Sequence, residues 1–348
     1  MLSELTQQMS AGNNLVADQI PLALEALVNE VETVNSKAKF LTVLAKKGET
    51  AEEIAGFAKE LLLRAISVPD LDELRATREI LDVCGTGGDR LNTFNISTTV
   101  ALVCAAAGVC VAKHGNRAIT SKSGSADVLE ALGIPVDLSP EAAADSMREH
   151  HFAFLFAPRF HPVFKGIGPA RKQCADLGQR TIFNFLGPLI NPARPTAQLL
   201  GVSRSELVEP MARTLQNLGL RRAMVVNGAV PGEGTLDELS TLGINQVCEF
   251  YQDRAFSQSE WSPANFPIKP ASLADLAGGD CRENAEIIRR ILCGKEQGPK
   301  RDAVLLNASA ALFVAGRVRS MSDGWDLAVE VLSDGRTETT LRALSGRQ

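Results

Sequence analysis

The chain has 348 residues, of which 45% are hydrophobic and 22% are charged, and its formal net charge is −5. This length allows one large domain and a smaller one, and the composition is that of an ordinary globular protein. The acidic balance and the 5% aromatic content argue against a basic surface with stacking platforms, so we expect no nucleic-acid partner.

Cysteine usage and the first residues predict a cytoplasmic protein. The seven cysteines are irregularly spaced and include no Cys-x-x-Cys pair, which favours reduced thiols over a disulfide framework. The N-terminus lacks a basic region followed by a long apolar run, and the longest apolar run, residues 100–112, is too short to span a bilayer. We therefore expect neither a signal peptide nor a membrane partner.

Residues 1–78 are predicted to form a small all-helical domain. Apolar residues recur at helical spacing in residues 21–27 and 37–45. Thr50 followed by Glu53 is a capping box, which marks the start of a further helix. No strand-like alternation of apolar and polar residues occurs in this part of the sequence.

The pattern then changes, and a large α/β domain is predicted for residues 79–348. Residues 80–84 are a short apolar run stopped by a glycine, as in a buried strand. Asn95 or Ser97 caps the helix that follows, and residues 109–112 form the next apolar run. A strand, a helix and a strand at this spacing predict a parallel unit with a right-handed crossover.

The remaining elements predict an α/β fold in which helices cover a central, mostly parallel sheet. Residues 162–192 contain a helix and then a stiff connection with two prolines, and we expect them to cross back and complete the helical domain. Further strands are predicted at residues 152–157, 196–202, 223–227 and 246–250, and further helices at residues 205–218, 283–292, 301–315 and 325–332.

The sequence G-T-G-G-D at residues 85–89 follows the first predicted strand. Glycines let the backbone approach a ligand closely, and the amides of such a turn can bind an anion. A plain strand-to-helix turn explains the motif equally well when it is taken alone. Its spacing matches neither the dinucleotide motif nor the Walker A motif, and the next strand ends in Lys113 instead of the acidic residue that NAD binding requires.

The sequence N-I-S-T at residues 95–98 opens the predicted helix. Amides and hydroxyls at a helix N-terminus favour an anion, because the helix dipole is positive there. Simple N-capping is the alternative when the motif is taken alone. Because this motif and the glycine turn lie at the same face of the predicted sheet, we expect them to form one anion site.

The sequence K-H-G-N-R at residues 113–117 falls where the second strand should end, with Ser121 and Ser125 close behind. In open α/β sheets, ligands bind beyond the carboxyl ends of the strands. A surface loop rarely combines a lysine, an arginine, an asparagine and several serines with nearby glycines. We therefore interpret this turn as anion-binding, although His114 taken singly could equally be a structural histidine.

Asp237 and Glu238 follow the strand predicted at residues 223–227 and a glycine-rich turn. Adjacent carboxylates repel each other and are costly unless they are solvated or neutralised. Oxygen ligands beside phosphates suit Mg²⁺, which keeps most of its waters. A solvated acidic turn is the alternative, and it would be preferred without the other motifs.

Taken together, these motifs resemble the anthranilate phosphoribosyltransferase family, which belongs to the nucleoside phosphorylase and phosphoribosyltransferase class with a small helical and a large α/β domain. The resemblance covers nearly the whole chain, and K-H-G-N-R followed by S-G-S-A-D-V-L-E is its most specific part. The other motifs are K-G-E-T at residues 47–50, G-T-G-G-D at 85–89, N-I-S-T at 95–98, F-A-P at 156–158, H-P at 161–162, R-T-I-F-N at 180–184, L-G-P at 186–188, D-E at 237–238 and L-N-A at 306–308.

The resemblance implies an activity, a cofactor and an assembly. The activity is the transfer of phosphoribose from phosphoribosyl pyrophosphate to anthranilate, which gives N-(5-phosphoribosyl)anthranilate and pyrophosphate in tryptophan biosynthesis. The cofactor is Mg²⁺, with two ions, and the assembly is a homodimer through the helical domain. No nucleophile or base stands out, and Lys113, Asp237 and Glu238 are expected to act electrostatically.

The same resemblance implies the site residues. For phosphoribosyl pyrophosphate they are Gly85, Gly88, Asp89, Thr93, Asn95, Ser97, Thr98, Lys113, His114, Gly115, Asn116, Ser121 and Ser125. For anthranilate they are Gly85, Asn116, His161, Arg171, Gly187 and Pro188, and for the metal they are Ser97, Asp237 and Glu238. Residues 174–176 are additional to the usual family length, so Lys172 is an alternative to Arg171.

Two alternative functions stay open at this point. A paralogous phosphoribosyltransferase would use the same donor with a different aromatic amine or base. A non-catalytic relative would bind nucleic acid, although the acidic net charge and the presence of the acidic pair argue against it.

Overall fold

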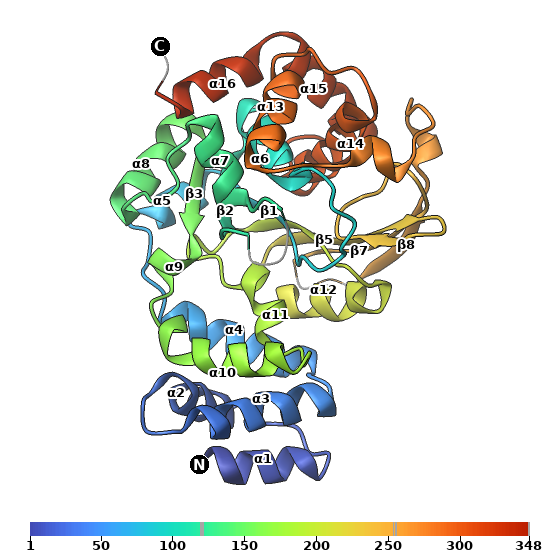
Figure 1. The fold of residues 1–348 in the computed structure, drawn as a ribbon. Helices are drawn as coiled ribbons and strands as arrows, with labels where there is room; N and C mark the ends of the chain where they lie inside the picture. The colour runs from blue at the N-terminus through green and yellow to red at the C-terminus, as the bar shows by residue number, and fades with distance from the viewer. Residues whose placement is uncertain (119–121, 253, 255, 347–348) are drawn as a thin grey trace.

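The computed structural model describes residues 1–118, 122–252, 254 and 256–346. Figure 1 shows a central sheet between two helical layers, with the N-terminal helices below it and helices of the C-terminal third above it. The predicted fold class, a mostly parallel sheet covered by helices together with a small helical domain, is confirmed. The exact limits of the two domains, residues 1–78 and 79–348, stay a prediction.

The N-terminal bundle packs its helices through apolar stripes, in which Phe40 and Phe57 are fully buried. The predicted capping box is present, because Thr50 and Glu53 each bind the backbone amide of the other. Glu53 also pairs with Lys47 at 2.8 Å, which ties the end of one helix to the start of the next. The helices are α1 (Leu2–Ser10), α2 (Gln19–Val28), α3 (Val34–Lys47) and α4 (Ala51–Leu63), and α5 (Leu71–Thr77) leads to the sheet.

The sheet has eight strands in the order β3-β2-β1-β4-β5-β7-β8, with β6 paired to β5. Strands β1 to β5 are parallel, whereas β6, β7 and β8 are antiparallel to their neighbours. The sequence pattern does not predict β6 or β8, because one is very short and the other is polar. The strands are β1 (Ile80–Gly85), β2 (Cys110–Gly115), β3 (Phe152–Phe156), β4 (Ala197–Gly201), β5 (Arg222–Val230), β6 (Gly234–Leu236), β7 (Asn245–Tyr251) and β8 (Ser257–Trp261).

Two nearly fully buried helices, α6 (Ile96–Ala106) and α14 (Pro299–Val314), form the middle of the upper layer. They are apolar on almost every side because the sheet and further helices cover them. No helix in the described part of the chain is long and apolar enough to cross a membrane. The further helices are α7 (Ser125–Leu132), α8 (Pro140–His150), α13 (Cys281–Leu292), α15 (Met321–Ser333) and α16 (Arg336–Leu344).

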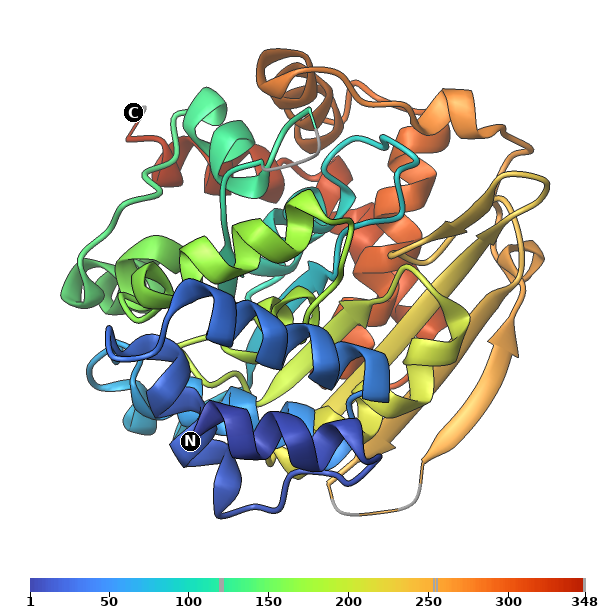
Figure 2. The same ribbon diagram turned by 60° about the horizontal axis from the view of Figure 1, so that its bottom comes forward.

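Residues 162–192 lie against the N-terminal bundle, as Figure 2 shows for α10 beside the bundle helices. The Lys37 ammonium donates to the Gly166 carbonyl at 3.2 Å, and a Cβ on Gly166 would lie 2.2 Å from the Val28 carbonyl oxygen. The chain then returns to the sheet. The elements on this side are α9 (Ala157–Phe160), α10 (Phe164–Asp176), α11 (Phe183–Leu186), the 3₁₀ turn η1 (Gly187–Leu189) and α12 (Val208–Asn217).

The sheet has its topological switch at β1, which pairs in parallel with β2 on one side and with β4 on the other. Gly85 at the end of β1 lies opposite Gly201 at the end of β4, and Gly201 lies opposite Val226 of β5. The loops that leave these strands therefore meet at one edge of the sheet. In open α/β sheets this is the usual place for a ligand.

Candidate active site

The acidic pair Asp237 and Glu238 lies directly across the carboxyl ends of β1 and β4. The Gly87 amide donates to Asp237 Oδ2 at 2.6 Å. A Cβ on Gly85 would lie 2.1 Å from Asp237 Oδ2, and a Cβ on Gly201 would lie 1.6 Å from the Asp237 carbonyl oxygen. Any side chain at either strand end would push the pair away, so the glycines allow these distant segments to meet.

Two buried asparagines hold the loop that carries the acidic pair. Asn307 of α14 accepts a hydrogen bond from the Leu239 amide and donates one to the Leu239 carbonyl, both at 2.9 Å. Asn227 of β5 donates to the Leu236 carbonyl at 3.4 Å. The backbone is thus held on both sides of the two carboxylates, which are presented on a fixed loop.

The electrostatic surroundings of the acidic pair favour a cation. Burial raises the pKa of Asp237, and repulsion by Asp89 raises it further. Burial also raises the pKa of Glu238, with repulsion by Asp237 in the same direction and the Lys113 ammonium and Ser97 amide in the opposite one. Buried carboxylates that repel each other are stabilised by a nearby positive charge.

The oxygen atoms of the acidic pair are the groups at this place that could bind a metal ion. Across the described residues, no group of three or more His, Cys, Asp and Glu side chains is arranged to hold a metal ion. Two carboxylates with a nearby hydroxyl are nevertheless the hard oxygen donors that Mg²⁺ prefers. The chemistry of these donors therefore fits Mg²⁺.

The N-terminus of α6 points at the same carboxylates. The Ser97 amide donates to Glu238 Oε1 at 3.2 Å, so an amide of the first helical turn already binds an anionic oxygen. The side chain of Asn95 does not cap the helix. It donates to the Ser123 carbonyl at 3.2 Å and accepts from Asn284 at 2.9 Å, which ties the helix start to its surroundings.

Lys113 brings a cation to this place from within β2, two residues before the strand ends at Gly115. Its side chain is 2% exposed. Its Nζ donates to the Val83 carbonyl at 2.6 Å and to Ser97 Oγ at 3.3 Å. Both of these hydrogen-bond partners are neutral, and the ammonium also stabilises the nearby carboxylates of Asp82 and Glu238 electrostatically.

The turn after β2 is closed by contacts between its two ends. A Cβ on Gly115 would lie 2.4 Å from Ser125 Oγ, which in turn donates to the Asn116 carbonyl at 3.3 Å. Arg117 pairs with Glu130 at 2.6 Å. The charge of Arg117 is therefore balanced within the turn in this structure, and its role as a cation for a ligand stays a prediction.

The loop of residues 92–95 is backed by a C-terminal segment, since Thr93 forms a β-bridge with Ala277. Two other residues expected at the donor site are not placed there directly. Thr98 is 1% exposed and lies in the interior, and Ser121 lies outside the described residues. The expectation that these two residues contact the donor stays a prediction.

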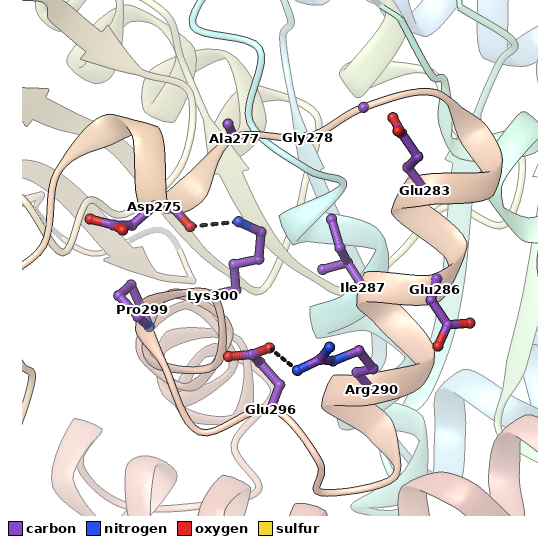
Figure 3. A pocket seen from close by; sticks show the side chains of 11 residues that line it. Asp275, Ala277, Gly278, Glu283, Glu286, Ile287, Arg290, Glu296, Pro299 and Lys300 are labelled. Carbon is purple, nitrogen blue, oxygen red and sulfur yellow. Dashed lines mark hydrogen bonds and ion pairs between the residues drawn. The ribbon is translucent and has the colours of Figure 1, made fainter.

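A cavity of about 590 Å³ lies between α13 and α14, outside the site described so far (Figure 3). Its cations have partners within the protein. Lys300 Nζ donates to the Asp275 carbonyl at 2.6 Å, and Arg290 pairs with Glu296 at 3.4 Å. The arginine of this cavity is thus balanced by a carboxylate, and its lysine by a backbone carbonyl.

His114 and His161 form the side of the site that faces residues 162–192. Their rings lie 5.2 Å apart, edge to face, and His114 Nδ1 donates to the Gly187 carbonyl at 3.2 Å. Burial lowers the pKa of His114 to about 3 and that of His161 to about 4. Among the described residues, His114 Nε2 has no hydrogen-bond partner, which leaves it available to a polar ligand.

Arg171 of α10 adds a positive charge to this side of the site. Its guanidinium lies 5.9 Å from the Phe164 ring and 5.3 Å from the Phe183 ring, and Phe164 is 5.6 Å from His161. Burial alone lowers the pKa of Arg171, so within the described part of the chain no carboxylate balances its charge. Lys172, the alternative, is exposed, whereas Arg171 is partly buried.

Two residues near the glycine turn were missing from the site residues that the sequence implies. A Cβ on Gly88 would lie 3.8 Å from Arg180 Nη2 and 3.9 Å from Ser203 Oγ. Ser203 could have been found, because it follows a predicted parallel strand whose carboxyl end had to reach the site. Arg180 opens the R-T-I-F-N motif, but its place beside Gly88 depends on how residues 162–192 fold.

The two sides of the site define a class of protein. The sheet edge offers amides and a lysine to anionic oxygens, with carboxylates for a cation beside them. The neighbouring side offers aromatic rings, neutral imidazoles and an arginine. This combination suits a transferase that joins a phosphorylated donor to an aromatic, carboxylate-bearing acceptor.

Family models and relatives agree with this class. The model described as "Glycosyl transferase family, helical bundle domain" matches residues 3–65, and "Glycosyl transferase family, a/b domain" matches residues 77–338. An anthranilate phosphoribosyltransferase from Lacticaseibacillus casei (strain BL23) is 44% identical over 344 residues, which are 99% of this chain and 96% of the relative. The chain belongs to the anthranilate phosphoribosyltransferase family.

Solved structures show the same likeness over almost the whole length. The anthranilate phosphoribosyltransferase of Thermus thermophilus has a TM-score of 0.87 at 40% identity, and 98% of each chain is covered. That of Saccharomyces cerevisiae in complex with PRPP and Mg has a TM-score of 0.85 at 27% identity, covering 99% of this chain and 97% of the other.

The two buried histidines generate a prediction on pH. Their folded-state pKa values of about 3 and about 4 lie below the ordinary value of 6.5, so the unfolded chain binds protons first as pH falls. These groups therefore lower stability between pH 6.5 and pH 4. In NMR titrations from pH 7.5 to 5, the ring signals of His114 and His161 should not shift. A midpoint near 6.5 for either ring would contradict the assignment.

Proposed function

We propose that this protein transfers phosphoribose from phosphoribosyl pyrophosphate to the amine of anthranilate and releases pyrophosphate, a step of tryptophan biosynthesis. The observation that carries the proposal is the meeting of Gly87, Ser97 and Lys113 at the acidic pair. Anion-binding and cation-binding groups alternate there, as a metal–diphosphate requires. The relative from Saccharomyces cerevisiae binds PRPP and Mg.

In this proposal the diphosphate of the donor binds the glycine turn, the α6 N-terminus and Lys113. The support is that the Gly87 and Ser97 amides already donate to carboxylate oxygens, which resemble phosphate oxygens in charge. Arg180 adds a cation beside Gly88. The other proposed donor contacts are Gly85, Gly88, Asp89, Thr93, Asn95, Thr98, His114, Gly115, Asn116, Ser121 and Ser125.

Ser97, Asp237 and Glu238 are proposed to hold Mg²⁺, with two ions. These residues fit the metal, because the carboxylates are buried and repel each other. When bound, Mg²⁺ supplies positive charge beside the pyrophosphate group as it leaves. The protein's own part is to present the carboxylates on the loop that Asn227 and Asn307 hold.

The acceptor is proposed to lie between the glycine turn and residues 162–192. Arg171 would bind its carboxylate, since the guanidinium lacks a carboxylate partner and rests on two aromatic rings. The His114 Nε2, left as an acceptor by the hydrogen bond that Nδ1 donates, suits an amine hydrogen. The proposed contacts are Gly85, Asn116, His161, Arg171, Gly187 and Pro188.

The reaction depends more on stabilising the charge of the leaving group than on a catalytic base. When the bond between ribose C1 and pyrophosphate breaks, negative charge develops on the leaving group, and Lys113 with the α6 amides stabilises it from fixed positions. The aromatic amine attacks as a neutral nucleophile, so no strong base is required to generate it. Holding both substrates in line supplies much of the remaining rate.

We further propose a homodimer through the helical domain, in the cytoplasm. The support for the dimer surface is that most exposed large hydrophobic side chains of the described residues lie near the N-terminus, where a partner would cover them. They are Met1, Val16, Leu22, Val31, Val34, Leu63 and Ile66.

The activity itself is tested by fluorescence. Anthranilate should disappear only when phosphoribosyl pyrophosphate, Mg²⁺ and the protein are all present, with pyrophosphate formed in equal amount. If anthranilate is not consumed while another aromatic amine or base is, the acceptor assignment fails and the paralogous activity takes its place. Retention of single-stranded DNA on filters at moderate salt, with no turnover of any acceptor, would contradict the enzymatic proposal altogether.

The metal site is tested by combining Asp237→Asn with Glu238→Gln. Removing both charges should lower kcat/KM by about 100-fold or more at low Mg²⁺, because the cation loses its protein ligands, and high Mg²⁺ should restore part of the activity. Asp302→Asn, which removes a buried carboxylate of α14, is the matched control and should keep the wild-type Mg²⁺ dependence. Full activity of the double variant at low Mg²⁺ would contradict the assignment.

The acceptor site is tested by Arg171→Ala with Lys172→Ala as its control. Loss of the charge-assisted bond to the acceptor carboxylate should raise the KM for anthranilate about 10- to 100-fold and leave the KM for the donor nearly unchanged. Lys172→Ala should change neither value, because this side chain is exposed. Equal effects of Arg171→Ala on both KM values would refute the placement of the acceptor.

A further inference from the structure

Two buried polar side chains lie side by side in the middle of the sheet, with apolar residues as their immediate neighbours on that face. Asp82 of β1 and Gln198 of β4 are paired in register, so they lie side by side, and they are 0% and 1% exposed. Their neighbours on the same face are apolar: Ile80, Cys84, Ala112, Leu200 and Ala223. The burial of a carboxylate and an amide in this position therefore requires an explanation.

Both side chains bind the segment that runs from Gly187 to Asn191. Gln198 Nε2 donates to the Pro188 carbonyl at 2.8 Å. Asn191 Nδ2 donates to Asp82 Oδ2 at 2.9 Å and to the Ala112 carbonyl at 2.7 Å. Together with the bond from His114 to Gly187, the segment is held to β1, β2 and β4 at both of its ends.

These contacts are a costly way to gain stability. Burying a carboxylate or an amide without partners is unfavourable, and even a well-bonded pair is often no more stable than apolar side chains of the same volume. Burial raises the pKa of Asp82 to about 6, and the Lys113 ammonium is the main influence that lowers it. Apolar residues could fill this space equally well. The polar pair is therefore better explained by the position in which it holds the segment.

We propose that Gln198 and the Asp82–Asn191 pair are positioning residues for the acceptor, because they fix the height of the Gly187–Pro188 turn above the sheet. This inference rests on the proposed function, in which that turn lies against anthranilate. Neither Gln198 nor Asn191 reaches the reacting atoms, and they act through the turn. Loosening the turn weakens acceptor binding and leaves in place the Gly87 and Ser97 amides, which are held by other contacts.

The test is Gln198→Met, which keeps the side-chain length and removes the donor to Pro188. The KM for anthranilate should rise about three- to tenfold, the factor expected for one lost neutral hydrogen bond, and the KM for phosphoribosyl pyrophosphate should change less than about twofold. In hydrogen exchange, peptides covering residues 183–192 should exchange faster, and peptides covering residues 85–97 should not.

Thr214→Val is the matched control, because it removes a buried hydroxyl that donates to Pro210 within α12, away from the turn. It should lower thermal stability in the same way as Gln198→Met and leave both KM values unchanged. Equal rises of both KM values in Gln198→Met, or an unchanged KM for anthranilate, would overturn the inference. If the wild-type protein does not use anthranilate, the proposed function fails instead, and the inference falls with it.

Discussion

The arrangement of this protein depends on one close approach, in which the backbone at Asp237 crosses the ends of β1 and β4. Gly85 and Gly201 leave no room for a Cβ, and Gly228 is pressed against the Glu238 carbonyl in the same way. As a result, two carboxylates sit within hydrogen-bonding distance of the amides of the glycine turn and of the α6 N-terminus. Groups that bind cations and groups that bind anions are thus held together, and a metal–diphosphate would bind to both.

The two sides of the site come from different parts of the architecture. The anion-binding side is built on the parallel strands and α6, whose burial fixes it firmly. The acceptor side is built largely from residues 162–192, which pack on the N-terminal bundle and return to the sheet. A motion of the bundle relative to the sheet would therefore move Arg171 relative to Lys113 and change the distance between the two substrates.

Local patterns in the sequence were sufficient for the parallel strands, the buried helices and the donor motifs, because apolar runs, glycine stops and capping residues act within a few positions. They were not sufficient where a contact between residues distant in the sequence determines the structure. The polar edge strand β8 and the short β6 exist because β7 and β5 offer hydrogen bonds to them. Arg117 is paired by Glu130, Arg180 reaches Gly88 and Gln198 holds Pro188, and each contact joins segments that no local pattern links.

The most direct test of the central claim is a crystal structure with phosphoribosyl pyrophosphate and Mg²⁺ bound. The diphosphate oxygens should lie within hydrogen-bonding distance of the glycine-turn amides and Lys113 Nζ, with Mg²⁺ between them and the carboxylates of Asp237 and Glu238. A donor bound in the cavity beside Arg290 and Lys300, or metal remote from the acidic pair, would contradict the account.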